Sequence, residues 1–151
     1  MGLKDQVNAD ITEAMKARDN EKKDALRLLK AAIQRYEIDR TDSKNANYGK
    51  PITEDDILGV VQKEIKQRRD SIEQYEKGGR TDLADKERVE LKYFEGYLPQ
   101  QMSRDEIAAA VQALIGREGK EFRKIMPLAA KELKGRADGR LVSEIVKELT
   151  S

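Results

Sequence analysis

Large apolar residues recur at every third or fourth position along almost the whole chain, and this spacing constrains the fold more than any other feature. Residues three and four apart share one face of an α-helix. The pattern occurs in seven stretches: 3–15, 25–36, 57–75, 83–98, 107–115, 122–133 and 141–149. Sustained alternation of apolar and polar residues, which would indicate strands, does not occur. We therefore predict an all-α fold.

Residues that favour helix ends separate these stretches. Thr53, Ser103 and Asp138 are suited to N-cap positions, because their side chains can accept a hydrogen bond from the first helical turn. We expect Asp19 to close the first helix and Gly116 to end the fifth. The polar residues after Pro99 form a short hinge. We therefore predict a helical domain of four helices (two helical hairpins) at residues 1–99 and a small three-helix tail domain at residues 100–151.

Two residue types that enzymes often use for catalysis are missing from the 151 residues. There is no histidine and no cysteine, which excludes imidazole bases, thiolate nucleophiles and the usual zinc ligands. There is also no glycine-rich loop of a nucleotide-binding protein. We expect no catalytic residue, no metal and no cofactor. The absence of cysteine, of an apolar signal segment and of a membrane span predicts a soluble cytoplasmic protein.

Positive charge is concentrated near the carboxyl end. Residues 120–140 contain three acidic side chains and seven basic ones, which are Lys120, Arg123, Lys124, Lys131, Lys134, Arg136 and Arg140. Such a surface attracts phosphate backbones through counterion release. The alternative is a helix face whose charges are solvated and have no ligand.

The segment from Lys134 to Arg140 joins two helical stretches through a tight turn. Gly135 and Gly139 flank Asp138, which can cap the last helix. Exposed amides at a helix N-terminus can hold a phosphate, although Asp138 would compete for the same amides. The residues fit a structural junction and a phosphate contact alike.

One arginine lies within an apolar stripe. Arg68 shares the helical face of Ile65 and Ile72. We expect its guanidinium to be partly buried and matched by a carboxylate from another helix.

Several blocks together resemble the GatB/YqeY family. They are Leu26–Ala32, Gln62–Ile72, Gly79–Leu83, Tyr97–Gln101 and Lys134–Arg140. The sequence is identified as a free-standing member, similar over its whole length to the C-terminal part of the B subunit of the glutamine-dependent Asp/Glu-tRNA amidotransferase. The resemblance implies a helical domain followed by a tail domain that contacts the outer corner of tRNA. It implies carbon–nitrogen ligase activity only by inheritance, because the family's chemistry lies in other domains.

These observations give one principal hypothesis and two alternatives. The principal one is a non-catalytic accessory protein that binds tRNA or another structured RNA and does not bind membranes. Its predicted site comprises Lys120, Lys124, Lys131, Lys134, Gly135, Arg136, Asp138, Gly139 and Arg140. The alternatives are a protein-interaction adaptor and a component of an amide-transferring ligase. The sequence leaves the oligomeric state open.

Overall fold

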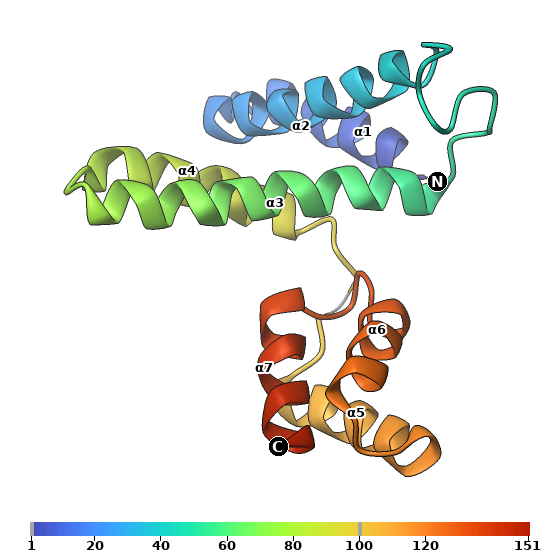
Figure 1. Cartoon of the computed structure of the whole chain (residues 1–151). Helices are drawn as coiled ribbons and strands as arrows, with labels where there is room; N and C mark the ends of the chain where they lie inside the picture. Colours follow the sequence, from blue (N-terminus) through green and yellow to red (C-terminus); the bar gives the residue numbers. More distant parts are fainter. Residues whose placement is uncertain (1, 100) are drawn as a thin grey trace. The chain divides into compact units, whose positions relative to one another are not determined.

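The computed structural model describes residues 2–99 and 101–151, and in these residues every regular element is a helix (Figure 1). The all-α prediction is confirmed. The chain divides into two compact units, the first ending at Leu98 and the second beginning at Pro99. The assignment of residues 1–99 and 100–151 as separate domains stays a prediction.

The first unit consists of two helical hairpins. Its helices are α1 (Leu3–Lys16), α2 (Asn20–Asp39), α3 (Glu54–Lys77) and α4 (Thr81–Glu95). The most extensive contacts are between α1 and α2 and between α3 and α4. Their apolar faces meet in one core, which includes Val7, Leu26, Leu29, Val61, Ile65 and Phe94.

The loop between α2 and α3 is fixed by one buried arginine. Arg40 Nη2 lies 2.8 Å from Asp56 Oδ2, and its Nη1 donates to the Lys50 carbonyl oxygen at 3.0 Å. Asp56 also completes a capping box with Thr53, the predicted N-cap of α3. The carboxylate of Asp56 therefore accepts hydrogen bonds both from Arg40, at the beginning of the loop, and from the backbone of Thr53, at the start of α3.

The second unit is a three-helix cluster. It contains α5 (Arg104–Glu118), α6 (Phe122–Glu132) and α7 (Gly139–Thr150). Each helix contacts the other two. The core consists of Ile107, Val111, Leu114, Ile125, Ala129, Leu133, Val142, Ile145 and Val146.

Three expected helix details are wrong. Asp19 does not close the first helix but caps α2, accepting a hydrogen bond from Lys22 N. Gly116 lies inside α5, which ends two residues later before Gly119. Met15, the last residue of the apolar stretch 3–15, does not face the core: it is 52% exposed, and Ala14 is the residue of that turn that is buried.

Candidate nucleic-acid interface

The core contacts of α6 determine which of its side chains face solvent. Ile125 and Ala129 are buried, and the same spacing continues to Leu133 after the helix. At about 100° per residue, the opposite side of the helix carries Lys124 and Lys131. Both are exposed, as are Arg123 near the start of the helix and Lys134 in the turn that follows it. We call these four residues the cationic face; its helical part, from Arg123 to Lys131, extends about 12 Å at 1.5 Å per residue.

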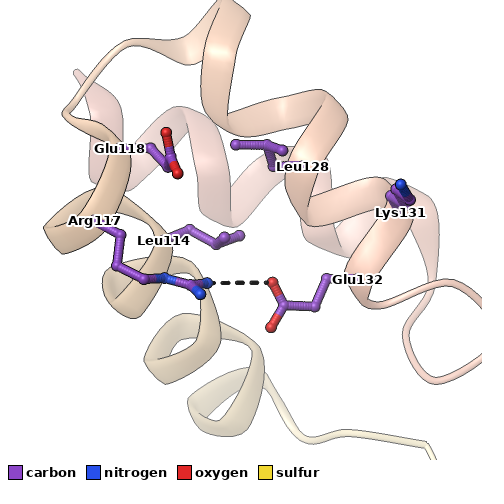
Figure 2. Close-up of a pocket in the computed structure, with 6 residues that line it drawn as sticks. All are labelled: Leu114, Arg117, Glu118, Leu128, Lys131 and Glu132. Atoms are coloured by element: carbon purple, nitrogen blue, oxygen red, sulfur yellow. Dashed lines mark ion pairs between the residues drawn. The ribbon is translucent and has the colours of Figure 1, made fainter.

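The two acidic side chains that form ion pairs near the cationic face, Glu132 and Glu118, are both exposed. Glu132, the only acid within α6, lies 3.7 Å from Arg117 of α5 (Figure 2). Lys124 Nζ lies 3.5 Å from Glu118 Oε2, and an exposed pair of this kind is weak enough to exchange for another anion. Within residues 101–151, we find no ion pair for Lys120, Arg123, Lys131 or Lys134.

The turn after α6 has a fixed left-handed residue. Gly135 is buried with φ 81°, a conformation that residues with a Cβ rarely adopt. Leu133 O accepts hydrogen bonds from Arg136 N and Ala137 N. Asp138 then caps α7 by accepting from Arg140 N at 3.0 Å, as predicted, and Gly139 is the first helical residue.

The chain entering the second unit is hydrogen-bonded to this turn. Gln101 Nε2 donates to Gly135 O at 3.0 Å, and Met102 N donates to Arg136 O at 2.8 Å. The pKa of Glu106 is lowered, chiefly by its hydrogen bonds in the capping box with Ser103 and further by the positive charge of Arg136. Arg136 is thus electrostatically linked to the start of α5.

The predicted site residues therefore form two groups. Lys124 and Lys131 lie on one side of α6, Lys134 follows the end of that helix, and exposed Lys120 lies just before its start. The others belong to the turn and the cap of α7: Gly135, Arg136, Asp138, Gly139 and Arg140. Asp138 already occupies an amide that a phosphate at this helix end would need.

Two basic residues next to the predicted site were missed. Arg123 belongs to the cationic face but was left out of the predicted site, although it stands eight residues before Lys131 on the same helix. Arg117 lines an open groove of about 380 Å³ between α5 and α6, together with Leu114, Glu118, Leu128, Lys131 and Glu132 (Figure 2). No local sequence signal indicates that groove, since its two walls come from different helices.

The first unit contains a cluster of partly buried charges. Arg68 Nη1 lies 3.0 Å from Glu64 Oε1, and its Nε lies 3.6 Å from Glu90 and 3.8 Å from Glu87 of α4. The guanidinium also stacks over Phe94, with its carbon 4.8 Å from the ring centre. The pKa of Glu90 is raised, first by burial and then by the neighbouring Glu87. The expectation for Arg68 is confirmed.

Neither a metal-ligand cluster nor a membrane-spanning helix occurs in the part of the chain that the structure describes. In residues 2–99 and 101–151, no three side chains of Asp, Glu, His or Cys are grouped so that they could hold a metal ion. No helix in these ranges has the length and apolar character needed to cross a bilayer.

Comparison with known proteins gives consistent matches. A family model described as Yqey-like protein matches residues 4–150. The chain is 40% identical over 98 residues to Altered inheritance of mitochondria protein 41, mitochondrial, of Vanderwaltozyma polyspora, covering 65% of this chain and 47% of that protein. Proteins of the same name from Eremothecium gossypii and Pyrenophora tritici-repentis are 34% and 31% identical, over 72% and 95% of this chain and 57% and 78% of theirs. The chain spans about half the length of the first two relatives.

These relatives correct the expected location. They are named as mitochondrial proteins, which points to a mitochondrial rather than a cytoplasmic location. The absence of cysteine and of apolar segments does not distinguish the cytoplasm from mitochondria, because mitochondrial transit peptides are amphipathic and rich in arginine.

Proposed function

The chain belongs to the family of YqeY-like proteins, as its motifs predicted, and on that basis we propose that it is a non-catalytic accessory protein that binds tRNA through its second unit. The cationic face of α6 binds the sugar–phosphate backbone. Recognition is of backbone shape, because the unit offers few aromatic side chains on which bases could stack.

One observation carries this proposal: three exposed cations of α6 and a fourth in the turn that follows it form the cationic face, and the helix's only acid, Glu132, pairs with Arg117 of α5. Lys131 and Lys134 have no ion pair within the described residues. A phosphate backbone would therefore replace water and counterions at these side chains, and no strong internal ion pair would have to break.

Salt dependence of binding tests the proposal. If the four residues of the cationic face each contact a phosphate, log K against log salt falls with a slope of about −2.8 to −3.6, at 0.7–0.9 per contact. Because the relatives are named as mitochondrial proteins, mitochondrial tRNA is the first probe. A flat slope would contradict the proposal.

A pair of double variants separates this site from general charge. Lys131→Gln with Lys134→Gln should reduce the slope by about 1.4–1.8 and weaken binding about 40-fold at 0.1 M salt, if these contacts contribute nothing at 1 M. The matched control is Lys63→Gln with Lys66→Gln, which removes two exposed cations from α3. Equal loss in both double variants would show that net charge alone attracts the RNA.

A further inference from the structure

The groove between α5 and α6 differs in charge from the cationic face beside it. Its walls are formed by Leu114, Arg117 and Glu118 of α5 and by Leu128, Lys131 and Glu132 of α6. These side chains include two cations and two carboxylates, so the groove has no net charge. A phosphate would be repelled by both carboxylates here, whereas an uncharged ligand would not be.

The size and the apolar surface of the groove fit a flat ring. Its volume of about 380 Å³ lies within the range of small-molecule sites, about 300–1,000 Å³. The buried Leu114 and the half-buried Leu128 supply the apolar surface. Figure 2 shows the Arg117–Glu132 ion pair at one end of the groove and Glu118 at the other. The groove therefore combines an apolar surface with polar groups at both ends.

The groove adjoins the cationic face through two side chains of α6. Lys131 belongs to both, and within the described residues it has no ion pair. Lys124 of the cationic face lies 3.5 Å from Glu118 of the groove, and both of these side chains are exposed. An RNA phosphate that binds Lys124 would therefore release Glu118 to accept hydrogen bonds from another group. Binding of the backbone would thus prepare the groove for a base of the same strand.

We propose that this groove binds one unstacked base of the RNA and prefers guanine. The proposal rests on the proposed RNA-binding function and adds one base contact to it. The face of the base would lie on Leu114 and Leu128, so that no aromatic side chain is needed. The two carboxylate oxygens of Glu118 would accept hydrogen bonds from the ring N–H and the exocyclic amino group of guanine.

Hydrogen-bond chemistry argues against the other three bases. An ionised carboxylate only accepts hydrogen bonds, and guanine alone offers two adjacent donors on its Watson–Crick edge. Adenine and cytosine have a ring nitrogen acceptor beside their amino group, and uracil has a carbonyl oxygen on each side of its ring N–H. Each of these acceptors would face an oxygen of Glu118 and would be repelled by it.

RNA hairpins that differ in one loop base test the groove on the full chain. The probes share one stem and a loop of uridines, in which one position is guanosine, inosine, uridine or an abasic site. We expect the guanosine loop to bind about tenfold more tightly than the uridine and abasic loops. The inosine loop should lose most of this preference, because inosine lacks the exocyclic amino group. Equal affinities for the guanosine and inosine loops would overturn the proposal.

Two carboxylate variants assign the guanine preference to the groove. Glu118→Gln removes one acceptor oxygen and the charge that pairs with Lys124, so the guanosine loop should lose its advantage while the uridine loop binds no more weakly. The matched control is Glu121→Gln, which removes an exposed carboxylate without a capping hydrogen bond and should leave the preference in place. A preference that survives Glu118→Gln, or one that is lost in both variants, would overturn the proposal.

Salt titration and a free nucleotide separate the remaining outcomes. If all loops bind equally but with the salt slope expected of the cationic face, the base site fails and the proposed function stands. If no hairpin binds, both proposals fail. Binding of guanosine monophosphate as tightly as the guanosine loop would identify a free nucleotide as the ligand and overturn the proposal of an RNA base.

Discussion

Arg68 holds together the α3–α4 hairpin, and replacing it gives the most quantitative test of the structure. Its side chain is 14% exposed, and it is the cation shared by Glu64, Glu87 and Glu90. Removing one partner of a buried ion pair typically costs 3–5 kcal/mol, because the other charge remains desolvated. The three carboxylates keep some water contact, so we expect Arg68→Met to lower the free energy of unfolding by about 3 kcal/mol at pH 7.5.

The loss should depend on pH. Without the guanidinium, the carboxylates can avoid repulsion only by taking up protons, so the destabilisation of Arg68→Met should shrink as pH falls towards 4.5. Urea denaturation followed by circular dichroism at both pH values measures it. The control is Arg69→Met, whose side chain is 40% exposed and 3.9 Å from Glu95; it should cost less than about 1 kcal/mol. Equal losses for both variants, or a loss that is the same at both pH values, would refute the reasoning.

Three further outcomes follow from contacts described in the structure. Burial and the neighbouring Glu87 raise the folded-state pKa of Glu90, so the stability that this residue contributes is full below its unfolded-state pKa and is lost as pH rises through its folded-state pKa. Glu90→Gln should therefore flatten the fall in the free energy of unfolding between pH 4.5 and 7 in urea titrations. An unchanged pH profile would contradict this. Gly135→Ala should cost about 1–2 kcal/mol in thermal denaturation, because φ is 81° there, and a neutral result would mean that the turn relaxes. Tyr97→Phe should cost about 1.5 kcal/mol in urea, because the hydroxyl donates to Asp10 Oδ2 at 2.5 Å; a cost near zero would show that water replaces this bond.

Local signals in the sequence predicted most of the helices. Thr53, Ser103 and Asp138 all cap the helices for which they were proposed, because capping depends on residues two or three positions apart. Asp19 was assigned to the wrong helix because the end of α1 and the start of α2 are separated by only three residues. Pro127 lies within α6, which begins five residues before it.

Contacts between residues that are distant in the sequence could be predicted only in part. The apolar position of Arg68 predicted a carboxylate from another helix but not which one, and α4 supplies Glu87 and Glu90. The hydrogen bond from Gln101 to Gly135 spans 34 positions and has no counterpart in spacing or composition. The excess of basic residues at 120–140 predicted a positively charged surface. It did not predict that these residues divide between α6 and the turn after it, because that division depends on how α6 packs against α5 and α7.

The hydrogen bonds from Gln101 and Met102 to the turn between α6 and α7 determine which N-terminal truncations preserve the second unit. A fragment starting at Arg104 would keep all three helices of the second unit yet lose both donors, leaving the carbonyls of Gly135 and Arg136 without these partners. A fragment starting at Pro99 would keep them. For the same reason, a pulling force on the chain just before Gln101 would act first on the loop joining α6 and α7, through the hydrogen bonds to Gly135 and Arg136. This loop follows the lysines at the end of α6.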